Sequence, residues 1–435
     1  MRFKGLLALL ISMLCVEVSY AGNFRAAVVE TDITPTRPQW LLGYGARQSD
    51  GVHDQIYQRV AALDDGKTTV YFVSTEIAVM SPGYFDKVAQ EIQRQLGIAP
   101  QNIWWTATHT HSAPEVGPPG VPAIFMPERY KQASTGESNP EYSRFIEEKL
   151  IEELKLARQK LQPARLGIGL GFSTANINRR AIDVGGKVDL GMNPDRPVDR
   201  QIGVIRLETL DGALIGLVAN YAMHGTTLGG ENLKITGDSP GVVAKYVEEK
   251  LGAPVLFING AEGDVAPIYS QTPNFDRAHL GEFRLLLGDR ILQANKRISE
   301  LTSDVSLAPS EIWVETPLRK GLVWPSDPDL GKYVRTTSGG TTLVRIPVRF
   351  LQINHETVVW GAPLEMFCEI AIDVRNSSRF PFTFFFGLTN GWIGYLPIAT
   401  AMHEGGYEPS VSPFTDRGED DFREAVMTHF ATLAR

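Results

Sequence analysis

The sequence contains very little cysteine, with 2 residues among 435. One of them, Cys15, lies in an apolar N-terminal segment that we expect to be removed, which leaves Cys368 alone. A disulfide framework is therefore excluded, and an ordinary hydrophobic core must hold the chain together. The composition agrees, since 43% hydrophobic and 21% charged residues are typical of a globular protein.

Positive charge and long apolar runs are also scarce. Lys and Arg number 42 against 50 Asp and Glu, a formal net charge of −8. Proteins that bind nucleic acid neutralise phosphates with a basic surplus, so we expect no nucleic-acid partner. After the N-terminus, no apolar run approaches the roughly 20 residues of a transmembrane helix, so we expect no membrane-spanning segment in the mature chain.

The N-terminus has the pattern of a secretory signal peptide. Arg2 and Lys4 precede an apolar run over residues 5–16, and small residues follow for cleavage near Ala21. An uncleaved membrane anchor is the alternative, but Glu17 and the shortness of the run disfavour it. We therefore expect an exported protein, either periplasmic or secreted.

Helix and strand patterns alternate through the first 300 residues, and strands dominate afterwards. The nearly continuous apolar run Leu214–Tyr221 is typical of a strand buried on both faces. We expect an irregular stretch between strands at residues 164–170 and 201–207, and a helix over residues 364–375. The pattern predicts an α/β or mixed α+β fold, with a layered β-sheet core flanked by helices. No linker interrupts residues 22–435, so we expect a single domain.

Histidine is scarce as well, and two of the 8 residues stand two positions apart at the end of a predicted strand. The aromatic and β-branched run from Trp104 leads into Thr108-His109-Thr110-His111, and a turn rich in Pro and Gly follows. Because side chains alternate along an extended chain, both imidazoles can point the same way. Such a pair is a candidate metal or catalytic site, and a hydrogen-bonded loop is the other common explanation.

Other strand ends supply further titratable groups. His224 and Asp264 each follow an apolar strand and lie in a turn rich in Gly or Pro. In open α/β sheets, ligands and catalytic groups gather at the carboxyl ends of strands, so we expect these groups to converge with His109. Glu365 and Tyr395, in the C-terminal part, add two more ligand types.

Short motifs spread over nearly the whole mature chain carry a family resemblance. In order, they are residues 32–35, 51–54, 108–112, 176–179, 220–224, 237–241, 263–267 and 395–408. The combination of Thr-His-Thr-His-Ser with a later Gly-Asp-Val-x-Pro is specific, whereas either element alone is not. The sequence therefore resembles the neutral (non-lysosomal) ceramidase family, in particular its N-terminal catalytic domain.

The resemblance implies a Zn²⁺ site made of two histidines, one glutamate and one tyrosine. These match His109, His224, Glu365 and Tyr395, although the residues before Glu365 depart from the family pattern. Tyr407, twelve positions after Tyr395, matches a second family tyrosine and supports that alignment. As alternatives, Glu365 could be a carboxylate at a helix N-terminus, and the two tyrosines could be packing aromatics.

The resemblance also implies four catalytic residues. His111 would transfer a proton or polarise the substrate, and Asp264 would act as a base or orient one. Arg179 and Tyr407 would donate hydrogen bonds to the developing oxyanion or to a substrate headgroup.

Two departures from the family bear on the substrate. Family ceramidases carry a serine implicated in catalysis where this chain has Ala266, and no residue over 261–267 has a hydroxyl. We therefore expect a zinc-activated water in place of a serine nucleophile. Family ceramidases also carry an immunoglobulin-like C-terminal domain, which we do not expect here because the chain ends soon after Tyr407.

The leading hypothesis is an exported zinc-dependent hydrolase that cleaves an N-acyl amide, with ceramide as the reference substrate. Its partner would be a lipid or small molecule with an amide bond, which allows transient contact with a membrane surface. A second hypothesis is a zinc hydrolase of a non-sphingolipid amide or ester. A third is a binding protein of the same fold with reduced catalysis. Apolar residues over 113–139 could line an acyl-chain groove or pack on their own loop.

Overall fold

The computed structural model describes residues 22–45, 47–125, 139–270 and 279–433. The expected signal peptide, residues 1–21, lies outside the described residues, as do residues 126–138 of the expected loop. Within the described ranges, no helix combines the length and apolar character needed to cross a membrane.

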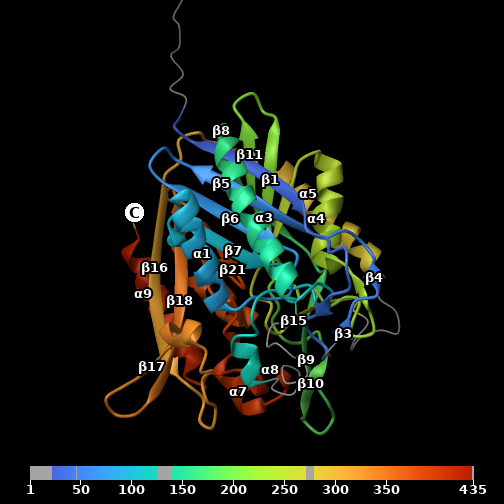
Figure 1. Cartoon of the computed structure of the whole chain (residues 1–435), viewed down its shortest axis with the longest axis vertical. Coiled ribbons are helices and arrows are strands. Elements are labelled where there is room, and N and C mark those ends of the chain that lie inside the picture. The colour runs from blue at the N-terminus through green and yellow to red at the C-terminus, as the bar shows by residue number, and fades with distance from the viewer. Residues whose placement is uncertain (1–21, 46, 126–138, 271–278, 434–435) are drawn as a thin grey trace, which may run out of the picture.

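The main sheet joins eight of the described strands in the order β14-β12-β11-β8-β1-β5-β6-β7 (Figure 1). These strands are β1 (Arg25–Asp32), β5 (Tyr57–Asp64), β6 (Thr69–Thr75), β7 (Ile103–Ala107), β8 (Gln162–Phe172), β11 (Gln201–Thr209), β12 (Leu214–Tyr221) and β14 (Val255–Asn259). The predicted buried strand Leu214–Tyr221 is confirmed as β12.

The main sheet bends sharply in its middle. β1 and β8 pair only at Arg25 and Ala26, so the strands on either side form two halves that lie against each other. Ser74 Oγ of β6, for example, donates to the Phe257 carbonyl of β14 across 2.5 Å. At the carboxyl ends, Asn259 Nδ2 donates to the Thr108 carbonyl across 2.8 Å, which brings the end of β14 to the end of β7. The predicted gathering of strand ends is thereby confirmed for these two strands.

The C-terminal part of the chain forms a second sheet with strand order β16-β18-β19-β21 and with β17 paired to β18. Its strands are β16 (Leu307–Pro317), β17 (Val334–Thr336), β18 (Thr342–Ile353), β19 (Thr357–Gly361) and β21 (Phe382–Phe386). Three two-stranded sheets pair β2 (Trp40–Leu41) with β3 (Arg47–Gln48), β4 (Gly51–Val52) with β13 (Lys234–Ile235), and β20 (Leu364–Met366) with β22 (Gly394–Leu396). A three-stranded sheet places β9 (Asn176–Ile182) between β10 (Val188–Asn193) and β15 (Val265–Pro267).

Helices accompany the sheets, and several of them pack directly on the strands. They are α1 (Pro82–Leu96), α3 (Pro140–Gln159), α4 (Asp238–Leu251), α5 (Asp289–Lys296), α6 (Cys368–Ser377), α7 (Ala399–Glu404), α8 (Tyr407–Ser410) and α9 (Gly418–Thr432). Short 3₁₀ turns lie at Pro100–Asn102, Val121–Ile124, Leu280–Glu282 and Pro328–Tyr333, and a π turn at Arg284–Gly288 precedes α5. α3 packs on β1 and β5, α4 on β14, and α5 on β8 and β11 (Figure 1). The predicted α/β architecture of sheets flanked by helices is confirmed.

Two expectations about local structure are wrong. The stretch between β8 and β11 is not irregular, because it contains the β9–β10 hairpin. Its residues are too polar to show a strand pattern, and pairing with β15 stabilises the strand conformation. The helix expected over residues 364–375 begins only at Cys368. Residues Leu364–Met366 pair with β22 instead, so Glu365 stands on a strand and not at a helix N-terminus.

Candidate metal centre

His109 lies directly after β7, where the chain turns. Its φ of +63° is left-handed, so the chain is not extended there, and the alternation expected for the two histidines is not the reason they meet. They meet nevertheless, with the two Nε2 atoms 3.2 Å apart. His109 is buried, and its Nδ1 lies 2.9 Å from the Ala78 carbonyl. Because a carbonyl only accepts, Nδ1 carries the proton and Nε2 presents a lone pair to the interior.

His224 follows β12 and repeats this arrangement. A parallel bridge between Thr110 and Gly225 joins the two histidine loops. Nδ1 of the fully buried His224 lies 3.0 Å from the Val265 carbonyl, so Nε2 again presents its lone pair. Burial, followed by the positive charge of Arg179, lowers the pKa of His224 to about 3, which keeps the ring neutral.

Glu365 completes a cluster of inward-facing acceptors. Trp392 Nε1 donates to its Oε1 across 2.5 Å. Its Oε2 lies 3.1 Å from His109 Nε2 and 2.9 Å from His224 Nε2, and no described group donates a hydrogen bond to it.

Two nitrogen lone pairs and a carboxylate oxygen face one another here. Arg179 Nη1 can donate to one of them, His224 Nε2, and a metal ion among the three atoms would satisfy them together. Ligand atoms around a tetrahedral Zn²⁺ with bonds of 2.0–2.1 Å are about 3.3 Å apart, close to the observed separations. The orphaned Glu365 Oε2 and the fixed tautomers of His109 and His224 therefore fit a divalent metal.

Tyr395 stands beside Glu365 because β20 and β22 pair in parallel with these two residues opposite each other. Its hydroxyl lies 3.4 Å from His224 Nε2 and accepts a hydrogen bond from Arg179 Nη2 across 3.1 Å. Burial and then the Glu365 carboxylate raise the pKa of this phenol well above its ordinary value. Tyr395 would therefore bind as a phenolate only with a cation beside it.

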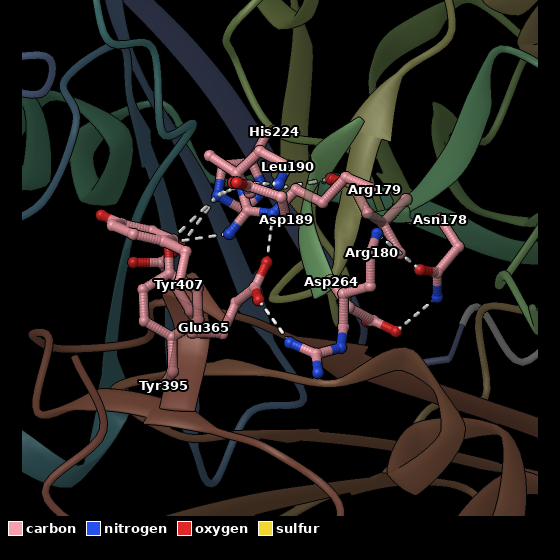
Figure 2. A network of polar contacts seen from close by, with 12 residues as sticks. Asn178, Arg179, Arg180, Asp189, Leu190, His224, Asp264, Glu365, Tyr395 and Tyr407 are labelled. Atoms are coloured by element: carbon pink, nitrogen blue, oxygen red, sulfur yellow. Dashed lines mark hydrogen bonds and ion pairs between the residues drawn. The ribbon is translucent and has the colours of Figure 1, made fainter. Parts of the chain in front are cut away.

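Arg179, from β9, is directed into the same cluster (Figure 2). Its Nη1 lies 2.9 Å from His224 Nε2, and its Nε donates to Glu408 Oε1 across 2.8 Å. The guanidinium carbon is 5.8 Å from the centre of the Tyr407 ring, which in turn lies 5.8 Å from the Tyr395 ring. Burial and then Glu365 raise the pKa of Tyr407 to about 12, so its hydroxyl keeps the proton that a donor needs.

His111 is half-buried at the edge of the cluster. Its Nδ1 is buried and has no hydrogen-bond partner among the described residues. Gly43 makes room for the ring, because a Cβ at this position would lie 2.3 Å from Nδ1. Burial, followed by His109 and His224, lowers the pKa of His111 well below its ordinary value, so the ring is neutral at pH 7.

Asp264 stands apart from the imidazoles. Its Oδ2 accepts from Asn178 Nδ2 across 2.7 Å, and its Oδ1 accepts from the Cys368 backbone NH at the start of α6 across 2.9 Å. Burial raises the pKa of Asp264 to about 6. These contacts join the carboxylate to β9 and α6 and not to the imidazoles.

Three residues of the site escaped the sequence analysis. Trp392 holds Glu365, Glu408 pairs with both Arg179 and Arg180, and Glu262 is a buried carboxylate near His109. The adjacent arginines were a usable signal for Glu408, because two buried guanidinium groups require a carboxylate. Neither Trp392 nor Glu262 has a comparable signal.

A layered α/β fold whose strand ends bring imidazole, carboxylate and phenol groups to one buried point defines a class of protein suited to a divalent metal. The family model for the N-terminal part of neutral/alkaline non-lysosomal ceramidases matches residues 24–274. This match covers more than half of the chain, and the chain belongs to the neutral/alkaline non-lysosomal ceramidase family.

Named relatives agree with this membership. The chain is 24% identical over 284 residues to a neutral ceramidase of Pseudomonas aeruginosa, an alignment that covers 61% of this chain and 41% of the relative. It is 26% identical over 223 residues to one of Mycobacterium tuberculosis, with 49% and 33% covered. The chain thus spans less than half the length of these relatives.

A solved structure shows the same fold. The crystal structure of neutral ceramidase from Pseudomonas aeruginosa superposes with a TM-score of 0.73 at 16% identity, covering 95% of this chain and 75% of that one. At this sequence identity, the structural similarity establishes the fold alone.

Proposed function

We propose that this protein is a zinc-dependent amide hydrolase of the ceramidase type. Its reaction would split the N-acyl bond of a ceramide-like lipid into a fatty acid and a sphingoid base. The observation that carries the proposal is the approach of Glu365 Oε2 to within 3.1 and 2.9 Å of two imidazole Nε2 atoms that present lone pairs. The names of the relatives support the choice of an amide lipid.

His109, His224, Glu365 and Tyr395 would hold the zinc. Imidazole and carboxylate donors suit Zn²⁺, and the Ala78 and Val265 carbonyls and the Trp392 indole orient the ligands as outer partners do in known zinc sites. When bound, zinc polarises the amide carbonyl and lowers the pKa of a water molecule.

Other residues of the chain would act on the substrate. The Arg179 guanidinium and the Tyr407 hydroxyl would donate hydrogen bonds to the developing oxyanion. His111, with a buried Nδ1 and neutral at pH 7, would accept or return a proton. Asp264 would hold neighbouring segments in place and would not react with the substrate itself, because its carboxylate accepts hydrogen bonds from Asn178 and from the start of α6.

Water would be the nucleophile. Ala266 lies on β15 in register with Ile177 of β9, at the place of the family serine, and its methyl group cannot attack a carbonyl. This difference also favours the second candidate, a zinc hydrolase of another amide or an ester. We propose export on the signal-like pattern of residues 1–21, with a lipid or small-molecule substrate, transient contact with a membrane surface and no nucleic-acid partner.

Metal analysis tests the centre. We expect about one zinc per chain in the wild-type protein and its loss in His109→Ala, since a ligand is removed. His403→Ala, which changes a surface imidazole paired with Asp416, should keep the metal. Equal zinc in His109→Ala and His403→Ala would contradict the site.

Substrate assays test the reaction. Release of fatty acid from a short-chain fluorescent ceramide supports ceramidase activity. Turnover of other amides or esters, but not of ceramide, favours the second candidate. If neither is cleaved while a ceramide analogue still raises the melting temperature, the protein is a binding protein.

A further inference from the structure

Glu262 has an unusual environment for a charged side chain. It lies in the loop between β14 and β15 and is fully buried. Both carboxylate oxygens are buried, and no described group donates a hydrogen bond to either. An ionised carboxylate buried without donors is strongly destabilising, so Glu262 carries its charge only if a cation lies beside it.

The neighbours of Glu262 are metal-ligand types. One of its oxygens, a nitrogen of His109 and an oxygen of Glu365 all lie within 4.8 Å of one another. Glu365 is itself an acceptor and His109 presents a lone pair, so neither can satisfy the second carboxylate. A cation among the three would satisfy all of them.

The loop holds Glu262 firmly at this place. The Gly263 NH donates to the Met366 carbonyl across 2.9 Å, which fastens the loop to β20, the strand that carries Glu365. A Cβ at Gly263 would lie 2.6 Å from the Glu365 carbonyl, so only glycine allows this approach. Gly387 likewise makes room, because a Cβ there would lie 2.9 Å from Glu262 Oε2.

We propose that Glu262 is a further ligand of the metal centre, so that two carboxylates, from Glu262 and Glu365, hold the cation. The inference rests on the metal site of the proposed function and deepens it. A second carboxylate makes the centre more anionic, so it binds a divalent cation more tightly and draws the ion toward the β14–β15 loop.

Glu262→Gln tests the proposal, because glutamine keeps the shape and removes the charge. Zinc dissociation constants are measured on the full chain by competition with a chromophoric chelator, and the Co²⁺-loaded protein is examined by visible absorption. Glu153→Gln is the matched control, since Glu153 is a buried glutamate between α3 and β5 whose Oε1 also lacks a partner.

We expect Glu262→Gln to weaken zinc binding at least tenfold and to change the Co²⁺ spectrum, which reports the ligand set. Glu153→Gln should leave both within twofold of wild type. The metal-free Glu262→Gln protein should melt no lower than wild type, because the carboxyl that glutamine replaces has no hydrogen-bond donor there. Unchanged zinc affinity and an unchanged Co²⁺ spectrum in Glu262→Gln would overturn the proposal.

Two further arms keep the outcome decisive. If Glu262→Gln does not fold, Glu262→Asp, with its carboxylate withdrawn by one methylene, decides in its place: a tenfold loss of affinity supports the proposal and an unchanged affinity overturns it. The zinc affinity of the wild-type protein tests the metal site by itself. If the wild-type protein binds no zinc, the proposed function is contradicted before any variant is compared.

Discussion

At the scale of single residues, hydrogen-bond direction decides the chemistry of the site. The carbonyls of Ala78 and Val265 can only accept, so they fix the protons of His109 and His224 on Nδ1. Both Nε2 atoms then turn lone pairs toward Glu365. No property of the isolated residues predicts this, since a neutral histidine can adopt either of two tautomers until a partner selects one.

Trp392 tests the importance of such outer partners. Trp392→Phe removes the indole NH that fixes Glu365 Oε1, so the carboxylate is no longer held toward the imidazoles. We expect zinc affinity to fall by about 10–100-fold while the chain stays folded. Trp360→Phe, another buried tryptophan on β19, controls for lost packing. Equal zinc affinity in the two variants would show that the indole only fills space.

At the scale of elements, an apolar pattern was enough to predict some strands, while others form only because of the strands that they pair with. Leu214–Tyr221 is a strand over its expected range because its apolar run is buried whatever its neighbours. β9 and β20 escaped, since their polar or short sequences form strands only beside β15 and β22. The element that carries Glu365 was therefore predicted with the wrong conformation, although the residue itself was singled out.

The interface between α3 and β5 contains a buried acid that makes stability depend on pH. Glu153 Oε2 accepts from Gln58 Nε2 across 2.6 Å, and burial raises the pKa of Glu153 to about 8 from an ordinary 4.5. The folded state therefore binds more protons than the unfolded state between these values. The stability that Glu153 contributes is complete below about pH 4.5 and is lost as pH rises through about 8.

Glu153→Gln should remove this loss. We expect the unfolding free energy of the variant, relative to wild type, to increase from pH 5 to pH 9 by on the order of 3 kcal/mol. Urea denaturation at pH 5, 7 and 9 measures it, with Glu152→Gln on the exposed side of α3 as control. A difference that stays constant with pH would mean that Glu153 is ionised throughout.

At the scale of the whole molecule, the site joins distant parts of the chain. His109 and His224 come from the N-terminal half, Glu365 and Tyr395 from the C-terminal part. The largest buried apolar cluster extends in sequence from Val29 to Phe430. Asn220 Nδ2 also donates to the Phe385 carbonyl across 3.0 Å, so β12 and β21 are joined directly. We propose on these grounds that residues 22–435 form one catalytic domain.

Truncation tests the single domain. A fragment of residues 22–300 contains the segment matched by the family model but lacks Glu365, Tyr395 and the second sheet. Because its half of the core would be exposed, we expect no cooperative unfolding transition and no zinc binding. Calorimetry and metal analysis of the fragment beside the full chain provide the measurement. A cooperative transition in the fragment would instead indicate two domains.

The amino-acid sequence was enough to predict the kind of fold and most of the proposed ligand types. Scarce cysteine required an apolar core, alternating patterns required layers of helix and sheet, and motif order led to the family that the comparisons confirm. How these groups act together depends on the folded arrangement. It determines which nitrogen of each imidazole carries the proton, the strand register that places Glu365 beside Tyr395, and the burial of Glu262. These properties depend on neighbours far away in sequence, and burial and missing donors exist only once those neighbours are in place.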